Sequence, residues 1–528
     1  MHEKHSCRVA CVGGDFGQGA GMISPTRRRF LAGSGAWLGG AALGFGQSGR
    51  ARTVSIFHTT DLHGHIEPTK TYDGLIDVGG LARCATCIRQ WRRESPHSIL
   101  VDVGDVYQGT PASLVSEGGM MIDLFNRLGY DAWALGNHDF DWGPEALEAN
   151  LTRSKPPVLT ANLERGGKKP GGFDGAWGKV LPWTMKEVGG FRIALVGLVT
   201  PGLPYWLSPE TLGGASATDP AVALQAAVNE AVAAKADAVV VMGHMGWRFQ
   251  DDFANPVRET LRAVKGVDVF LAGHSHQNQP TWSVDDVLCS QASYHGIHCG
   301  RVDLTFDLET RKLMDRRAFT LLMDDRYALD PAVMETARPD LKKAEEQLAR
   351  EVGEVKEVIP GRGRGSKLAN FFCECFAEAL GRAKVPVDGV FHGTFGTGDV
   401  MPGKVTVADC WTLLPYENLL ATAEVTAEEL IEIVREDRTD RRSDRTLWPF
   451  EIEMKRDAPP AKFLHRGQPV KEGQRFTIAF NSYDAQSGGR RLMRLREIVF
   501  QQGAKRRTTE IDTRSALIDG ILQRGGIS

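Results

Sequence analysis

The sequence predicts an α/β protein with a layered core, followed by a smaller α+β domain. Short β-rich runs alternate with helical patterns between residues 54 and 306, as in layered α/β folds. A polar helical stretch with a thin apolar face follows at residues 331–353, and mixed helix and strand patterns come after it. The 528 residues are 42% hydrophobic and 24% charged, which supplies apolar material for more than one core.

Six β-rich runs define the predicted layered core: residues 54–58, 98–103, 132–135, 191–199, 238–242 and 267–271. Helical patterns separate several of them, at residues 78–92, 120–128 and 220–235. A Gly/Lys-rich stretch at residues 164–178 is expected to be a loop.

The second part of the chain mixes helical patterns at residues 368–380 and 427–436 with a strand pattern at residues 476–480. We therefore expect four regions along the chain. They are a signal region at 1–51, the layered domain at 52–328, a linker helix at 329–354 and the second domain at 355–528.

The N-terminal region has the features of an export signal. Arg27, Arg28 and Arg29 precede Phe30-Leu31 and a Gly/Ala-rich apolar run at residues 32–45. The arginines before Phe-Leu resemble a twin-arginine signal, which predicts a periplasmic or extracellular protein. The apolar run is shorter than the roughly 20 residues that a membrane-spanning helix needs. A disordered basic N-terminus is the alternative.

Net charge and cysteine content argue against two kinds of site, a nucleic-acid-binding surface and a cysteine zinc site. A net charge of −3 gives no sign of a nucleic-acid-binding surface, which would need a strong basic excess. Cys84 and Cys87 form a CxxC within a helical pattern, but no second such pair accompanies them. They are therefore interpreted as helix residues or a local disulfide rather than as a zinc site.

Asp, His and Asn side chains follow five of the predicted strands. Ligands of open α/β sheets gather outside the carboxyl ends of the strands, so these side chains are expected at one place. Carboxylates and neutral imidazoles without thiolates suit divalent ions such as Mn²⁺, Zn²⁺, Fe²⁺ or Mg²⁺, and one carboxylate can bridge two ions. The expected metal-binding residues are Asp61, His63, Asp105, Asn137, His244, His274 and His276.

This ordered set, with Gly136-Asn137-His138-Asp139-Phe140-Asp141, resembles the calcineurin-like metallophosphoesterases, and more closely the 5′-nucleotidase and UDP-sugar hydrolase family. The resemblance implies a four-layer β-sandwich flanked by helices, a linker helix and an α+β substrate-binding domain. It also implies two divalent metal ions. One would be held by Asp61, His63 and His276, the other by Asn137, His244 and His274, with Asp105 as the bridge. His276 stands where this family commonly has Gln.

His138 and Asp141 resemble the catalytic dyad of that family. An imidazolium beside a phosphoryl group can stabilise the charge of the transition state or assist the leaving oxygen. Asp141, three residues further on, would orient His138 and keep it protonated through its opposite charge.

The second domain keeps part of the family's substrate motifs. Leu414-Pro415-Tyr416-Glu417-Asn418 and Asn481-Ser482-Tyr483 resemble the two segments whose aromatic rings stack on a base. The arginine of an N-x-G-G-x-R pattern is absent, and Arg490-Arg491 follow Gly488-Gly489 where the family has an acid. The expected substrate-binding residues are Arg362, Tyr416, Asn418, Tyr483 and Arg490.

These features predict metal-dependent hydrolysis of phosphate esters, with nucleoside 5′-monophosphates as the favoured substrates. Two alternatives remain. One is an enzyme like the thiosulfohydrolase of bacterial sulfur oxidation, on the same scaffold. The other is an exported nucleotide- or metal-binding protein without turnover.

Overall fold

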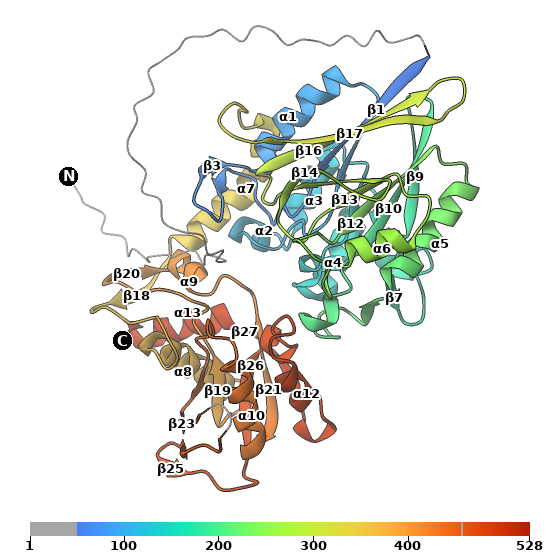
Figure 1. Cartoon of the computed structure of the whole chain (residues 1–528). Helices are drawn as coiled ribbons and strands as arrows, with labels where there is room; N and C mark the ends of the chain where they lie inside the picture. The colour runs from blue at the N-terminus through green and yellow to red at the C-terminus, as the bar shows by residue number, and fades with distance from the viewer. Residues whose placement is uncertain (1–49, 456–457) are drawn as a thin grey trace, which may run out of the picture.

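The structure, a computed structural model, describes residues 50–455 and 458–528. Figure 1 shows an N-terminal body, drawn from blue to yellow-green, and a C-terminal body, drawn from orange to red. The yellow helix α7 (Pro331–Leu348) lies where they meet. The expected export signal at residues 1–51 lies outside the described residues, except for Arg50 and Ala51.

The N-terminal body contains two large sheets. The first has seven strands in the order β17 (Leu313–Leu322), β16 (His298–Asp307), β1 (Ala51–Thr59), β4 (Ser98–Asp102), β5 (Ala132–Ala134), β6 (Val158–Leu159) and β8 (Val180–Leu181). The second has six, in the order β14 (Asn278–Val284), β15 (Val287–Ala292), β13 (Val269–Ala272), β12 (Ala238–His244), β10 (Phe191–Val199) and β9 (Trp183–Val188).

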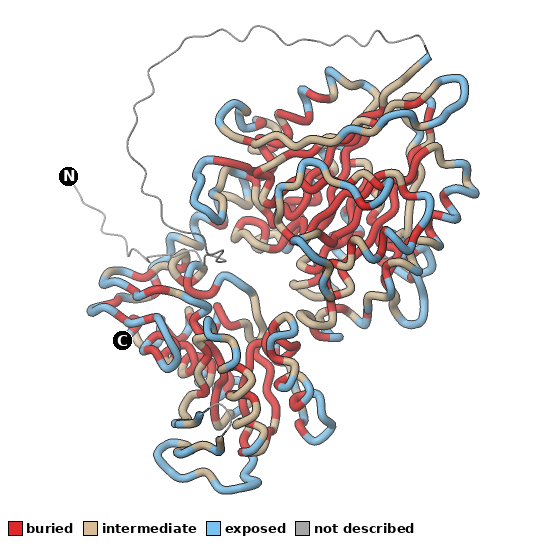
Figure 2. Tube along the Cα trace, in the orientation of Figure 1, coloured by how far each residue is buried: buried red, intermediate tan, exposed pale blue. Residues whose placement is uncertain are grey.

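The two sheets pack face to face. Alternate residues of each strand point to opposite faces of its sheet, so one set lies between the sheets and the other set faces the helices. Val54 and Ile56 of β1 share a buried cluster with Ile193 and Leu195 of β10, which is the core between the sheets. Phe57, the next residue of β1, belongs instead to the cluster beneath the helices. Figure 2 shows this burial as red strands in the interior of the N-terminal body.

Helices cover the outer faces of the sandwich. On the first sheet they are α1 (Leu81–Glu94), α2 (Pro111–Val115), α3 (Gly119–Leu128) and α4 (Gly143–Arg153). On the second sheet they are α5 (Pro220–Ala233) and α6 (Val257–Ala263). The resulting order of helices, sheet, sheet and helices confirms the predicted fold class.

The linker helix α7 is anchored at its first turn. The carboxylate of Asp330, fully buried, accepts hydrogen bonds from the backbone N–H groups of Ala332 and Val333, which caps the helix. The helix ends at Leu348, earlier than the helical pattern suggested. The next residues form the strand β18 (Glu351–Val355), because they pair with a neighbouring strand of the second body.

The C-terminal body is an α+β unit. Its main sheet has the order β22 (Thr446–Trp448), β19 (Gly389–His392), β26 (Arg475–Asn481), β21 (Leu419–Thr426) and β27 (Arg507–Asp512). Smaller sheets join β18 to β20 (Gly403–Thr406) and β28 (Gly526–Ile527), and β23 (Phe450–Glu453) to β24 (Lys462–His465) and β25 (Gln468–Pro469). The helices are α8 (Lys367–Arg382), α9 (Val407–Leu413), α10 (Ala427–Asp437), α11 (Ser482–Ala485), α12 (Met493–Val499) and α13 (Thr513–Arg524).

Local details refine the sequence-based expectations. The stretch 164–178 is not wholly a loop, because β7 (Leu163–Arg165) pairs with β11 (Ala215–Ala217) and a 3₁₀ turn forms at Gly175–Lys179. All seven cysteines of the described residues are buried free thiols, and Cys84 and Cys87 lie on α1. Within the described ranges, no helix combines the length and apolarity needed to cross a membrane.

Candidate metal centre

The strand ends of both sheets place the expected metal-binding residues. Asp61 and His63 follow β1, Asp105 follows β4 and Asn137 follows β5. His244 is the last residue of β12, and His274 and His276 follow β13. β1, β4 and β5 run parallel in one sheet, as do β12 and β13 in the other, so the residues emerge at the same edge of the sandwich.

The backbone at these strand ends is unusual. Asp61, His63, Asp105, His274 and His276 all have positive φ, between 48° and 65°, in the left-handed region that non-glycine residues seldom adopt. Such conformations cost about 1–3 kcal/mol each and concentrate at functional sites. The local structure therefore gives up stability to aim these side chains inward.

Glycine allows the strand-end loops to touch. A Cβ on Gly136 would lie 2.1 Å from Oδ1 of Asp105, and a Cβ on Gly104 would lie 2.6 Å from the backbone N of Gly136. Any side chain at these positions would push Asp105 away from the cluster.

The side chains form two groups of possible metal ligands, and within each group the ligand atoms lie within 4.8 Å of one another. The first is Asp61, His63 and His276, and the second is Asp105, His244 and His274. Asp105 also approaches the first group: its Oδ2 is 3.7 Å from Nε2 of His63 and 3.1 Å from Nε2 of His244. This carboxylate thus stands between the two groups.

The donor atoms fit divalent cations. Nδ1 of His63 donates to the carbonyl of Gln108, and Nδ1 of His244 donates to the carbonyl of Val103, both at 2.8 Å. Each ring therefore turns an Nε2 lone pair toward the cluster. Oδ1 of Asn137 is buried and has no hydrogen-bond partner among the described residues, a costly state that a cation would relieve.

The charge states of His63, His274 and Asp105 agree with this assignment, whereas His244 differs: although burial opposes it, Asp105 raises the pKa of His244 to about 9. Burial lowers the pKa of His63 and of His274 to about 3, so both rings are neutral and able to bind a metal at neutral pH. Asp105 is buried, yet the surrounding histidines hold its pKa well below the ordinary value, so it remains a carboxylate.

Asp139 organises the loop that carries Asn137. Its carboxylate accepts hydrogen bonds from the backbone N–H groups of Asp105, Val106 and Gly136, at 2.8–3.1 Å. It therefore joins the strand-end loops of β4 and β5 without facing the metal groups itself. The only sequence signal for a role of Asp139 is its position inside the Gly136–Asp141 motif. The role itself depends on tertiary contacts of the carboxylate.

His138 and Asp141 are paired, as the motif suggested. Nδ1 of His138 lies 2.6 Å from Oδ2 of Asp141, and the backbone N–H of His138 donates to Asp105 at 2.8 Å. Although burial opposes it, the charges of Asp141 and Asp105 raise the pKa of His138 to about 10. The ring is therefore an imidazolium at neutral pH.

Three residues of the C-terminal body, Tyr416, Tyr483 and Arg491, interact with one another, and Tyr416 also interacts with Asp141. Tyr416 is 54% exposed, and its phenol interacts electrostatically with Tyr483, Arg491 and Asp141, although burial is the main reason that the pKa of Tyr416 is raised. The guanidinium of Arg491 donates to the hydroxyl of Tyr483 at 2.9 Å. Both expected base-stacking tyrosines and one cation thus belong to one group, and Tyr416 is its member that interacts with Asp141 across the junction of the two bodies.

The remaining expected substrate residues lie apart from that group. The guanidinium of Arg490 covers the rings of Tyr205 and Phe253 in the N-terminal body, at 5.3 and 5.1 Å. Arg362 is exposed in the loop before α8, and its side chain makes no ion pair or hydrogen bond within the part of the chain that the structure describes. Asn418 precedes β21, and its carbonyl accepts from the N–H of Thr513.

Trp206 is a residue that no sequence motif indicated. Its ring lies 5.2 Å from that of His274, and a Cβ on Gly489 would lie 3.0 Å from its indole nitrogen. It therefore connects the metal groups with the glycine pair that follows Tyr483. Only the folded arrangement of the two bodies reveals this contact.

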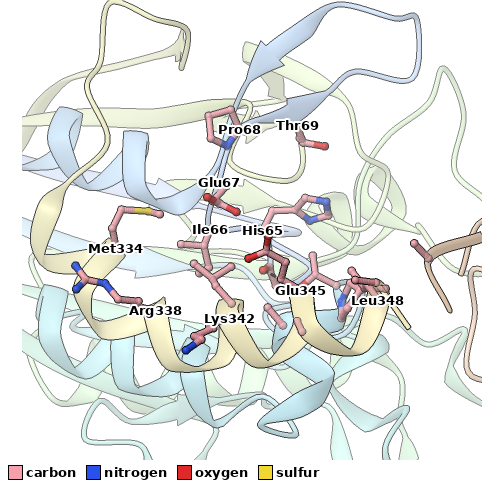
Figure 3. Close-up of a pocket in the computed structure, with 18 of the residues that line it drawn as sticks. His65, Ile66, Glu67, Pro68, Thr69, Met334, Arg338, Lys342, Glu345 and Leu348 are labelled. Atoms are coloured by element: carbon pink, nitrogen blue, oxygen red, sulfur yellow. Dashed lines mark hydrogen bonds between the residues drawn. The ribbon is translucent and has the colours of Figure 1, made fainter. Parts of the chain in front are cut away.

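Two hollows lie between the bodies. The larger, about 1290 Å³, is lined by Asp141, Trp142, Trp411 and Glu417 among others, so it adjoins the dyad. The other, about 960 Å³, lies between α7 and the segment Gly64–Thr69 (Figure 3). The first hollow therefore contains a residue of the His138–Asp141 pair, and the second does not.

Comparison with known families agrees with the geometry. The model of the calcineurin-like phosphoesterases matches residues 54–278, and the model of the 5′-nucleotidase C-terminal domain matches residues 351–496. The first match includes all seven expected metal residues and the dyad.

Individual proteins show the same likeness. A 5′-nucleotidase of Rattus norvegicus is 35% identical over 229 residues, which cover 42% of this chain and 38% of the relative. A 5′-nucleotidase of Homo sapiens is 29% identical over 351 residues, 61% of this chain and 59% of the relative. The matched part thus spans less than two thirds of either relative. A solved 5′-nucleotidase precursor from Thermus thermophilus shares the fold, with a TM-score of 0.65, 23% identity and coverage of 90% and 97% of the two chains.

Proposed function

The chain combines a calcineurin-like phosphoesterase domain with a 5′-nucleotidase C-terminal domain, and on this premise we propose that it is a metal-dependent phosphoric ester hydrolase. We propose nucleoside 5′-monophosphates as its preferred substrates. The two domain matches support hydrolysis of a phosphoric ester more strongly than they support a particular substrate, because function depends on the site rather than on the fold.

One observation carries the proposal: the position of Asp105 between two groups of ligands. Its Oδ2 lies within 3.7 Å of one imidazole from each group, so a single carboxylate can serve two cations. Two divalent ions held by the seven residues would supply the positive charge that activates a water molecule and neutralises phosphoryl oxygens.

His138 and Asp141 would act on the phosphoryl group of the substrate in addition to the metal ions. Asp141 holds Nδ1 of His138 and keeps the ring charged, so the ring can donate a hydrogen bond to a phosphoryl or leaving oxygen. Cations bound beside Asp105 would weaken the effect of that carboxylate on the pKa of His138. Asp141 is therefore the partner on which the charge of His138 depends.

Tyr416 and Tyr483 would bind the remote part of the substrate. Tyr483 lies in the short helix α11 after β26 and Tyr416 in the loop before β21, at the same end of the C-terminal sheet, and a tyrosine ring can stack on a flat base. Arg491, held by the hydroxyl of Tyr483, offers a cation where the family's arginine motif is missing. Arg362, Asn418 and Arg490 are proposed as outer contacts of the substrate.

We also propose that the protein is exported before it acts. The support is the twin-arginine-like pattern around Arg27–Arg29, together with relatives and a structural neighbour that are 5′-nucleotidases. The proposed regions remain 1–51, 52–328, 329–354 and 355–528.

The test is phosphate release by the purified chain with Mn²⁺, Zn²⁺, Fe²⁺ or Mg²⁺ on a panel of substrates. The panel contains nucleoside 5′-monophosphates, a sugar nucleotide, an aryl phosphate and a sulfur conjugate. We expect the highest kcat/KM on a nucleoside 5′-monophosphate. Hydrolysis of the aryl phosphate alone would refute the nucleotide specificity. Cleavage of only the sulfur conjugate would favour the thiosulfohydrolase alternative, and no turnover with any metal would favour the binding protein.

A further inference from the structure

A small hairpin lies next to the metal groups and has no role in the function proposed above. It is formed by β2 (Thr69–Lys70) and β3 (Ile76–Val78) in the segment between β1 and α1. Leu75 and Ile76 are 50% and 71% exposed, so the hairpin adds little to the hydrophobic core. Its turn carries Tyr72, which is 67% exposed and yet makes several specific contacts.

Tyr72 is fixed by Tyr294. The two rings stack with centroids 4.2 Å apart and planes 12° apart, and the backbone N–H of Tyr72 donates to the hydroxyl of Tyr294 at 2.8 Å. Tyr294 is buried in the loop after β15. The next residue of that loop, His295, donates its backbone N–H to the carbonyl of Asp61 at 2.7 Å. The hairpin is thus joined to the loop that holds Asp61.

The hydroxyl of Tyr72 lies 2.9 Å from Nδ1 of His276. On the other side of that ring, Nε2 is 3.4 Å from Oδ1 of Asp61 and 3.2 Å from Nε2 of His63. Since Nε2 faces the other ligand atoms, its lone pair must be free for a cation. Nδ1 then carries the hydrogen and donates it to the Tyr72 oxygen.

The three imidazoles share one arrangement. In His63 and His244, Nδ1 is held by a backbone carbonyl of a strand-end loop, at 2.8 Å in each case. In His276 the oxygen comes from a side chain on the exposed hairpin instead.

We propose that Tyr72 is a positioning residue, whose hydroxyl fixes the tautomer and orientation of His276 so that Nε2 can bind a metal ion. The inference rests on the metal centre of the proposed function. An oxygen that orients a histidine ligand usually contributes about 10- to 100-fold to metal affinity. Tyr72 therefore supplies to His276 the oxygen that backbone carbonyls supply to His63 and His244.

The experiment is metal titration of the full chain, stripped with a chelator and followed by calorimetry with Mn²⁺. For the unsubstituted chain we expect two bound ions. Tyr72→Phe keeps the stack on Tyr294 but removes the oxygen, so we expect about 10- to 100-fold weaker binding of one ion. Leu75→Ser, on the same hairpin, is the control and should bind both ions normally.

A second pair of variants separates positioning from a general effect on the fold. In a His276→Gln background there is no Nδ1, so adding Tyr72→Phe should cause no further loss of affinity. Equal losses in both backgrounds would refute the inference, as would normal affinity of Tyr72→Phe alone. If the unsubstituted chain binds no metal, the proposed function itself fails, which is a different result.

Discussion

At the scale of single residues, His138 is the side chain whose role can be tested most directly. Its Nδ1 is held by Asp141 at 2.6 Å, and its backbone N–H, which any substitution except proline retains, supports Asp105. Binding of metal and action on substrate can therefore be separated at this position.

We predict that His138→Gln lowers kcat about 10²- to 10⁴-fold, because the imidazolium no longer stabilises the developing charge. Affinity for Mn²⁺ should stay unchanged, because His138 belongs to neither ligand group. Steady-state kinetics beside calorimetric titration measure the two effects. A loss of metal affinity as large as the loss of kcat would show that His138 serves the metal centre instead.

Arg491 is the cation that the structure places nearest the two tyrosines. We predict that Arg491→Ala raises KM for a nucleoside 5′-monophosphate roughly tenfold, since a hydrogen bond to a charged group contributes about 1.5 kcal/mol. Arg494→Ala is a suitable control, because Arg494 is paired with Glu432 and Glu497 on the surface. An unchanged KM in Arg491→Ala would exclude contact with the substrate.

At the scale of elements, strand periodicity explains how much could be predicted. The run at residues 191–199 coincides with β10, and the run at residues 98–103 exceeds β4 by one residue. Because ligands gather at strand ends, the same reasoning indicated a site at Asp61 and Asp105. The periodicity of a strand is a local property, so the sequence alone can show it.

The contacts that complete the site could not be predicted in this way. The left-handed backbone of Asp61 and the hydrogen bond that Nδ1 of His276 donates to Tyr72 depend on loops that only the folded sandwich brings together. Trp206 reaches Gly489 from another body, 283 residues away in the sequence. Neither composition nor spacing contains a signal for such contacts.

A buried ion pair joins two loops of the C-terminal sheet. Arg445, just before β22, donates two hydrogen bonds to Asp484 of α11, at 2.7 and 2.6 Å, and neither side chain is more than 8% exposed. Burial raises the pKa of Asp484, but Arg445 lowers it more, so the net pKa lies below the ordinary value. Its contribution to stability is therefore present above pH 3.8 and is lost as the pH falls through the folded-state pKa.

We predict that Asp484→Asn destabilises the protein by about 1.5–3 kcal/mol at pH 7, because it removes the carboxylate that accepts two hydrogen bonds from the buried Arg445 and leaves only Asp437, 3.6 Å away, as its acidic partner. Urea unfolding at several pH values measures this. The deficit should shrink in strong acid, where the original chain also loses the pair. Asp519→Asn, on α13, is the control, and equal stability of the two variants would contradict the prediction.

At the scale of the whole molecule, Gln108 links the metal centre to the C-terminal body. Its backbone carbonyl holds Nδ1 of His63, while its side chain donates to Glu417 at 2.9 Å. Glu417 in turn accepts from Arg514 at 2.6 Å, and Arg514 stacks on Trp411 at 3.4 Å. The position of the second body is therefore coupled to His63, a proposed metal ligand, through Gln108.

The roles of the Gln108 side chain and of its backbone carbonyl can be tested separately, because a substitution removes the side chain and keeps the carbonyl. We predict that Gln108→Ala leaves the Mn²⁺ affinity unchanged but raises KM, since the contact between the bodies loses about 0.5–1.5 kcal/mol or more. Ser487→Ala is the matched comparison, because Ser487 donates across the same junction to the carbonyl of Tyr205, away from His63. Weaker metal binding by Gln108→Ala than by Ser487→Ala would mean that the Gln108–Glu417 bond, rather than the carbonyl alone, holds His63 in place.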